Sequence, residues 1–348
     1  MSDAYAAAGV DISGSDAGVR AIVDVLRGIN PGRPSRSVLD SGHYASVLRV
    51  TDELGIALCC DGVGTKLLVA EQTGRWDTVG IDCVAMNVND VVCVGAEPIA
   101  LLDYVAVERA DPDLLAAIGV GLRAGAEAAG VEIPGGEVAV LPELIRGHPS
   151  PGGFDLTAAC FGTVALDAMV TGADCAPGDA LIGLPSSGLH SNGYSLARRA
   201  LEPLGLDARP EPLGGASVAD ALLEPTAIYV RAVLELLRAH VPVRGLAHIT
   251  GGGLLNLLRL GDAIGFEVSE PLPVLPVFEL VQELAGVADA EMWEVFNMGC
   301  GFCIVCPEGD ADAAIARLDR HHPGTRRIGT VTDRAGRAEV PGLGVALG

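Results

Sequence analysis

A glycine loop between a predicted strand and a predicted helix constrains this chain more than any other stretch. The apolar run Ile56–Cys60 predicts a strand, the loop reads DGVGTK from Asp61 to Lys66, and a helix is expected over Lys66–Gln72. Glycines allow backbone N–H groups to approach a phosphate closely, and a lysine adds a point charge. The loop taken alone also fits an ordinary tight turn, because it lacks the spacing of a Walker loop.

A second polar cluster follows within an apolar helical pattern. It contains Asp82, Asn87, Asn89 and Asp90, and the small-residue run Gly95-Ala96-Glu97-Pro98 comes after it. Asn87 and Asp90 are spaced to share one helix face, whereas Asn89 is not. Carboxylate oxygens are ligands that Mg²⁺ prefers. Together, the two clusters favour a site for phosphate and magnesium.

The length and the pattern of elements predict two domains of α+β class. A chain of 348 residues exceeds one typical compact core, so we divide it into residues 1–166 and 167–348. Strand and helix patterns alternate without repeats, and each half is expected to form a mixed sheet with helices on one face. A strand over Phe154–Ala165 closes the first half, a strand over Ala180–Leu184 opens the second, and Thr226–His240 is expected to be a helix.

Composition excludes several classes of protein. Lys+Arg number 23 and Asp+Glu 45, which gives a formal net charge of -22 and argues against a non-specific nucleic-acid binder. The N-terminal residues lack the pattern of a secretory signal, and no apolar run reaches the roughly 18 residues that a membrane helix needs. Cys300 and Cys303 have C-x-x-C spacing without a second pair, so buried thiols are favoured over a metal or redox site. Uncommitted cysteines suggest a cytoplasmic location.

Three further loops are candidate ligand contacts, and each has a structural alternative. Pro134–Glu137 is a small-residue loop whose acid could face a ligand or start a helix. His190 lies in SSGLHSNGY, among small hydrogen-bonding residues, and fits a general acid or substrate contact as well as a structural histidine. Thr250–Gly253 could offer N–H groups to an anion at the start of a predicted helix, or allow close packing. Patterns of serine hydrolases, zinc proteases and dinucleotide-binding folds are absent from the sequence.

Read in order, these motifs resemble the phosphoribosylformylglycinamidine cyclo-ligase family, also called aminoimidazole ribonucleotide synthetases. The resemblance rests on AGVDI, DGVGTK, GIDCVAMNVND, GAEP, LLDY, GGE, SSGLHSNGYSLAR, LLEPTAIYV, AHITGGG and EMWEVFNMGCGF, which span nearly the whole chain. The signature of the wider superfamily occupies Asp90–Pro98, and GHYASVLRV is similar to the archaeal-type branch.

The resemblance implies an ATP-dependent ring closure with Mg²⁺ in de novo purine biosynthesis. ATP would phosphorylate the formamide oxygen of formylglycinamidine ribonucleotide, an amidine nitrogen would attack, and loss of phosphate would leave the imidazole. It also implies a homodimer whose N-terminal sheets pair into a barrel, with ATP held by the first domain of both chains and the second domain completing the substrate cleft. No nucleic acid or membrane partner is expected.

The resemblance also assigns residues to roles, motif by motif. The implied magnesium ligands are Asp61, Asp82 and Asp90, and the implied catalytic residues are Asp61, Lys66 and His190. The implied ATP contacts are Gly62, Gly64, Thr65, Lys66, Asn87, Asp90, Gly135, Gly136 and Glu137. The implied substrate contacts are Ser187, His190, Ser191, Asn192, Thr250, Gly251 and Gly252.

Three departures from the family pattern keep other functions open. Ala6 replaces a lysine, Val138 follows the acid of GGE where a threonine is usual, and the loop after Gly253 is one residue short. A paralogous ATP-dependent enzyme, either a small-molecule kinase or an amide-activating enzyme, is therefore the alternative. A non-catalytic scaffold is a third hypothesis, but it predicts degraded ligand loops, and Asp61, Lys66 and Asp90 are all present.

Overall fold

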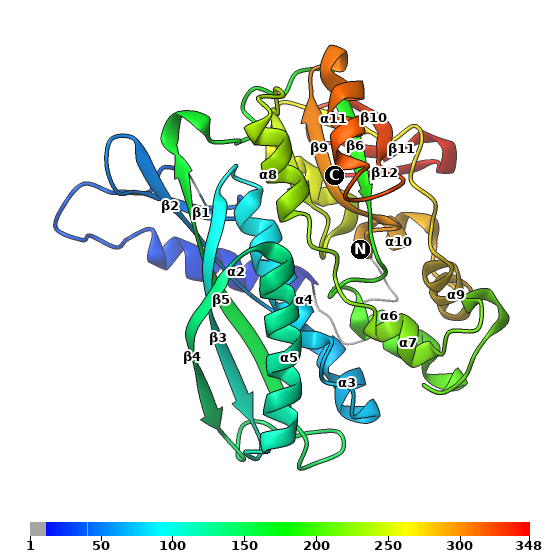
Figure 1. The fold of residues 1–348 in the computed structure, drawn as a ribbon. Helices are drawn as coiled ribbons and strands as arrows, with labels where there is room; N and C mark the ends of the chain where they lie inside the picture. Colours follow the sequence, from blue (N-terminus) through cyan, green and yellow to red (C-terminus); the bar gives the residue numbers. More distant parts are fainter. Residues whose placement is uncertain (1–11, 40) are drawn as a thin grey trace.

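The structure is a computed structural model that describes residues 12–39 and 41–348, arranged as two sheets with their helices (Figure 1). Ala6 lies outside the described residues. The N-terminal half forms a five-stranded sheet in the order β1-β2-β5-β3-β4, in which only β3 and β4 are parallel. Its strands are β1 (Ser46–Arg49), β2 (Leu54–Gly62), β3 (Glu97–Val107), β4 (Glu132–Val140) and β5 (Phe154–Ala165).

Helices α4 and α5 pack on one face of this sheet, and we call the opposite face, which carries the exposed Leu102 and Tyr104, the free face. The helices of this half are α2 (Ile12–Leu26), α3 (Leu67–Thr73), α4 (Val79–Val92) and α5 (Pro112–Ala129). Helix α5 begins at a capping aspartate, Asp111, whose carboxylate accepts from the N–H groups of Asp113 and Leu114. α4 and α5 cross at Gly80 and Gly121. A Cβ added at Gly80 would lie 2.2 Å from Leu122 N of α5, and one added at Gly121 would lie 2.2 Å from Asp77 O, just before α4. Only glycine at these two positions allows the helices to pack this closely.

The C-terminal half forms a seven-stranded sheet in the order β12-β11-β8-β10-β6-β9-β7. All its neighbouring strands are antiparallel except β8 and β11. Its strands are β6 (Ala180–Pro185), β7 (Gly245–His248), β8 (Gly265–Glu267), β9 (Cys300–Cys306), β10 (Arg326–Thr332), β11 (Ala338–Val340) and β12 (Val345–Leu347). The helices are α6 (Tyr194–Leu201), α7 (Val218–Leu223), α8 (Val230–Arg238), α9 (Pro276–Ala285), α10 (Asp289–Val295) and α11 (Ala311–Leu318).

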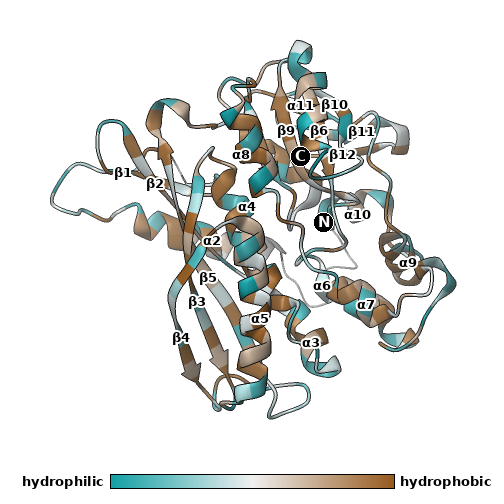
Figure 2. Ribbon diagram, viewed as in Figure 1, coloured by the Kyte–Doolittle hydropathy of each residue, from teal (hydrophilic) through white to brown (hydrophobic). Residues whose placement is uncertain are grey.

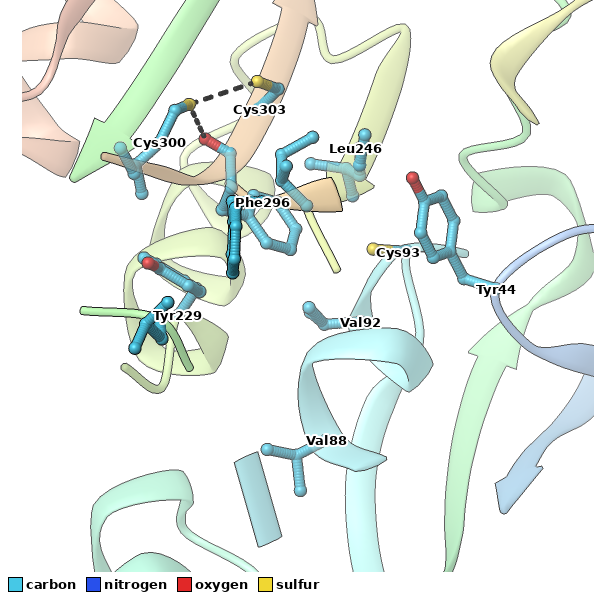
Figure 3. Close-up of a cluster of buried hydrophobic side chains, with 14 of the residues drawn as sticks. Tyr44, Val88, Val92, Cys93, Tyr229, Leu246, Phe296, Cys300 and Cys303 are labelled. Carbon is cyan, nitrogen blue, oxygen red and sulfur yellow. Dashed lines mark hydrogen bonds between the residues drawn. The ribbon is translucent and has the colours of Figure 1, made fainter. Parts of the chain in front are cut away.

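The two halves share one continuous apolar core. In Figure 3, Val88 and Val92 of α4 lie in the same buried cluster as Leu246 of β7 and Phe296 after α10. Cys300 and Cys303 border this cluster with their sulfur atoms 3.5 Å apart, and all nine cysteines are free thiols. Helix α4 is therefore packed between the N-terminal sheet and elements of the C-terminal half, including β7 and α8.

The predicted α+β class with two mixed sheets is confirmed, and three local predictions are wrong. The predicted loop Pro134–Glu137 lies within edge strand β4, because pairing with β3 outweighs the turn preference of its proline and glycines. The predicted helix over Thr226–His240 starts only at Val230, since the preceding residues bond to α4 instead. The helix expected from Leu254 is the short 3₁₀ segment Gly253–Leu260. Across residues 12–39 and 41–348, no helix is long and apolar enough to cross a membrane.

Candidate active site

Asp61 lies near the end of β2, and Asn87 of α4 holds its backbone in place. Asn87 Oδ1 accepts from Asp61 N–H at 3.0 Å, and Asn87 Nδ2 donates to Asp61 O at 3.0 Å and to Cys83 O at 2.9 Å. Because Asn87 is fully buried and its amide is used by the protein, the predicted contact between Asn87 and ATP does not fit the structure. Its observed contacts orient Asp61, whose half-buried carboxylate accepts from Gly62 N–H at 2.7 Å.

Asp61 and Asp90 form a pair of carboxylates that fits a magnesium ion. Burial raises the pKa of Asp61, and the negative charge of Asp90 raises it further. Asp90 accepts from His248 Nδ1 at 2.9 Å and keeps 15% of its side chain exposed. Among the described residues, no three His, Cys, Asp or Glu side chains are grouped to hold a metal ion alone. Magnesium usually takes one or two carboxylates and completes its shell with phosphate oxygens and water, so this pair suits it.

Asp82, the third predicted magnesium ligand, is separated from this pair by its own partners. Its carboxylate lies 2.9 Å from Lys66 Nζ, and both side chains are fully buried. Lys66 Nζ also donates to His190 O at 3.2 Å and to Glu224 O at 2.6 Å. Three acceptors match the three N–H bonds of an ammonium group. The predicted roles of Lys66 on phosphate and of Asp82 on magnesium therefore do not fit, because the two groups are paired with each other and fully buried.

Residues 224–229, between α7 and α8, belong to the C-terminal half and hydrogen-bond to α4 of the N-terminal half. We call this segment the interdomain strap. Thr226 donates to Asp82 Oδ1 from its backbone N–H at 2.8 Å and from its hydroxyl at 2.6 Å. Asn89 of α4 accepts from Tyr229 N–H and donates to Ala227 O, each at 2.9 Å. Two buried polar residues of α4 thus fix the strap, which explains why the helix starts late.

His190 is closed off from solvent, contrary to the predicted role as a substrate contact or general acid. It is 1% exposed, and its backbone φ of 61° lies in the left-handed region. His190 Nε2 accepts from Ser187 N–H at 3.2 Å, and burial holds the pKa of His190 well below its ordinary value. The ring is therefore neutral with its proton on Nδ1. It stabilises the turn of the loop rather than offering an acid to the cleft.

The other residues of this loop are more open, and they meet the predicted phosphate and anion loops. Ser191 and Asn192 are half-buried. A Cβ at Gly64, on the exposed rim of DGVGTK, would lie 4.0 Å from Ser191 O, and one at Gly251 would lie 3.1 Å from Asn192 Oδ1. Asn256 Nδ2 donates to Gly251 O at 3.1 Å and to Gly253 O at 2.9 Å, which orders the glycine loop. Loops from three distant parts of the sequence converge here.

Gly135, Gly136 and Glu137 lie elsewhere, on the free face of the N-terminal sheet. Glu137 pairs with Tyr104, which pairs with Thr157, which in turn pairs with Gly62, so two of the predicted ATP contacts, Gly62 and Glu137, share one row across four strands. A shallow cavity of about 410 Å³ on this face is lined by Cys60, Leu102, Asp103, Tyr104, Gly136, Glu137, Thr157, Ala158 and Ala159. Burial raises the pKa of Asp103, whose carboxylate lies against Gly136.

Thr226, His248 and Asn256 also belong to this region, although none of them was predicted as a site residue. Each lies within or beside a motif that carries the family resemblance: LLEPTAIYV, AHITGGG and the shortened loop after Gly253. These motifs could have indicated that their segments contribute to the site. No rule of sequence spacing, however, links Thr226 to Asp82 or His248 to Asp90, because these contacts are made across the two halves.

Comparison with family models matches both halves of the chain. Residues 42–164 match the N-terminal domain of AIR synthase related proteins, and residues 176–340 match the C-terminal domain. The chain belongs to the AIR synthase related family. Together the two matched ranges contain the DGVGTK loop, helix α4, the interdomain strap and the glycine loop.

Two archaeal relatives carry the same name. The "phosphoribosylformylglycinamidine cyclo-ligase" of Methanothermobacter thermautotrophicus is 50% identical over 306 residues, which cover 87% of each chain. That of Thermococcus gammatolerans is 46% identical over 347 residues, covering 99% of each. The suspected resemblance to this family and to its archaeal members is confirmed.

The solved structure of hydrogenase maturation protein HypE in complex with ATP shares the fold. It superposes with a TM-score of 0.60 at 24% identity, covering 90% of this chain and 89% of that one. At this identity the likeness concerns architecture alone. It does not favour the scaffold hypothesis over the cyclo-ligase hypothesis, whereas the archaeal relatives favour the latter.

Proposed function

We propose that this protein converts formylglycinamidine ribonucleotide and ATP into aminoimidazole ribonucleotide, ADP and phosphate in the cytoplasm. The observation that carries the proposal is the 50% identity, over 87% of each chain, to a protein named as this cyclo-ligase. The neighbouring Gly64 and Ser191 segments support it, because they bring the glycine loop that follows Asp61 next to a polar loop of the second half.

The reaction needs positioning and charge stabilisation more than a nucleophile of the protein. The formamide oxygen takes the γ-phosphoryl group of ATP, an amidine nitrogen forms the new C–N bond at the formyl carbon, and the C–O bond breaks as phosphate leaves with one proton released. Holding these groups in place can supply much of the rate enhancement. Ser191 and Asn192, the open residues of the His190 loop, would orient the substrate, and Thr65 and the amides of Gly62 and Gly64 would face phosphate oxygens.

Magnesium would be held by Asp61 and Asp90, with ATP oxygens completing its shell. The ion supplies charge neutralisation of the phosphates when it is bound. His248 orients Asp90 through the 2.9 Å bond from Nδ1, and Asn87 orients Asp61 through its backbone. The ATP-bound fold relative supports a nucleotide in a protein of this architecture.

A homodimer is part of the proposal. The free face of the N-terminal sheet carries Leu48, Leu102 and Tyr104, which are 38%, 44% and 40% exposed. Figure 2 shows apolar residues along the strands of this sheet. Pairing of two such faces would bury them, form the expected barrel, and bring Glu137 of the free-face cavity toward the second copy. Equilibrium sedimentation should give a dimer for the wild-type protein and a monomer for Leu102→Glu.

One assay tests the activity. The purified protein is incubated with formylglycinamidine ribonucleotide, ATP and Mg²⁺, and aminoimidazole ribonucleotide and phosphate are measured together. Equal amounts of both products are expected, and Asp90→Asn should abolish both. Phosphoryl transfer without imidazole formation would instead identify a small-molecule kinase, and ATP binding without turnover would favour a scaffold.

A further inference from the structure

A chain of hydrogen bonds leads from the buried ion pair to the half-buried surface of the His190 loop. Lys66 and Asp82 are fully buried, Thr226 is 2% exposed, and Ser191 is the first member that is half-buried. Ser191 Oγ lies 3.2 Å from Thr226 Oγ1, and Thr226 Oγ1 lies 2.6 Å from Asp82 Oδ1. The chain therefore ends at Ser191, a residue whose backbone carbonyl oxygen would lie 4.0 Å from a Cβ at Gly64.

The direction of each bond in this chain follows from the ion pair. An ionised carboxylate only accepts, so the hydroxyl of Thr226 must donate its proton to Asp82. Thr226 Oγ1 then has only lone pairs left for Ser191, so Ser191 must donate its own proton to Thr226. Ser191 Oγ consequently offers lone pairs alone to any ligand that reaches it.

We propose that Thr226 is a positioning residue that fixes Ser191 as a hydrogen-bond acceptor, so that the site selects a substrate N–H group beside the phosphoryl-transfer loop. The ligand class is an amide or amidine, whose nitrogen carries the required proton. The assignment of that nitrogen to the reacting end of the substrate rests on the proposed function. The polarity of the Ser191 hydroxyl does not, because it follows from the ion pair.

Ser191→Ala and Thr226→Val test the contact and its support separately. Ser191→Ala removes the acceptor, and Thr226→Val removes the group that takes the Ser191 proton while keeping the side-chain shape. Each should raise KM for the substrate about fivefold to tenfold, the effect of losing one neutral hydrogen bond of about 1 kcal/mol, and leave KM for ATP unchanged. Thr226→Ser keeps the hydroxyl and should restore most of the substrate affinity.

The double variant Ser191→Ala/Thr226→Val gives the sharper result. Because Thr226 acts through Ser191, the double variant should bind substrate no worse than Ser191→Ala alone. Effects that multiply, an unchanged KM in folded Thr226→Val, or a Thr226→Ser variant as impaired as Thr226→Val would each overturn the proposal. Far-UV circular dichroism and the ATP-dependent shift of Tm identify variants that have failed to fold. If the variants do not fold, the neutron structure of the wild-type protein described next tests the proposal in their place.

A neutron structure of the deuterated wild-type protein tests the polarity without any substrate. The deuteron of Ser191 should point to Thr226 Oγ1, and that of Thr226 to Asp82. A Thr226 deuteron directed at Ser191 would refute the assignment even if the enzyme makes aminoimidazole ribonucleotide. Conversely, the expected deuterons in a protein that makes no such product would leave the acceptor in place and refute only the proposed function.

Discussion

The buried pair of Lys66 and Asp82 allows a stability prediction with a worked magnitude. In Asp82→Asn, Lys66 would remain fully buried without a counter-ion. Its burial already lowers its pKa, and Asp82 opposes that shift, so the variant should force Lys66 to give up its proton. Holding a lysine neutral at pH 7 costs about 5 kcal/mol, given an ordinary pKa of 10.5 and 1.36 kcal/mol per unit. This agrees with the roughly 3–5 kcal/mol typical of breaking one partner of a buried pair.

Removing both charges should cost less than removing one. In Lys66→Met/Asp82→Asn no charge is left buried, and the main loss is the donor to His190 O and to Glu224 O. At about 1 kcal/mol for each hydrogen bond, we expect a loss of about 2 kcal/mol. The two single losses should therefore be far from additive in the double variant.

Urea unfolding followed by tryptophan fluorescence can measure these values, because Trp76 lies in the N-terminal half and Trp293 in the C-terminal half. Glu127→Gln is the matched control: it breaks the exposed bridge to Arg123 on α5 and should leave the midpoint unchanged. Additive losses in the double variant would refute the reasoning. So would an Asp82→Asn deficit that stays constant from pH 7 to pH 10, since the cost of removing the lysine proton falls as the pH approaches the ordinary pKa of 10.5.

Three further changes should have measurable effects. Asp61→Asn should abolish turnover yet raise Tm at pH 7. The pKa of Asp61 is raised in the folded protein, so this carboxyl contributes stability at low pH that is lost as the pH rises through its folded pKa. The increase in Tm of the variant over wild type should therefore vanish near pH 4 in scanning fluorimetry. Burial lowers the pKa of His322, whose ring contacts that of Tyr229 at a tilt of 41°, to about 4. The protein should therefore lose roughly 3 kcal/mol between pH 6.5 and 4, and His322→Phe should flatten that dependence in urea unfolding. Gly136→Ala should lower Tm, since its Cβ would lie 2.7 Å from Asp103 O, whereas Gly135→Ala, with no neighbour nearer than 4.0 Å, should not.

The sequence predicted the class of fold well because its periodic segments agree with the tertiary structure. The strand Phe154–Ala165 and the strand beginning at Ala180 were both found at the predicted positions, because each is a run of apolar and small residues bounded by turns. Where the predictions failed, a contact between distant residues had decided the local structure. Thr226 would suit a helix start, but its N–H and hydroxyl are taken by Asp82.

The sequence predicted the motifs of the candidate site, but several of the roles assigned to their residues do not fit the structure. Residue type alone marks Lys66, Asp82 and His190 as candidates for phosphate, metal and acid chemistry. Burial decides otherwise, and burial depends on how the second half packs on α4. Asp61 and Asp90 keep their predicted role as a proposal because each retains some exposure. Sequence spacing identifies neighbours along one helix. The partners of Asp82 and Asp90, which are Thr226 and His248, come instead from the other half of the chain.

The interdomain strap also limits how the protein can respond to its ligands. A hinge motion between the two halves would require breaking the buried bonds of Asp82 and Asn89 to the strap. The angle between the two halves should therefore stay the same when nucleotide binds, and small-angle scattering should record one radius of gyration with and without ATP. Such a site selects its ligands by a shape that exists before they bind, so its selectivity should not depend on domain motion.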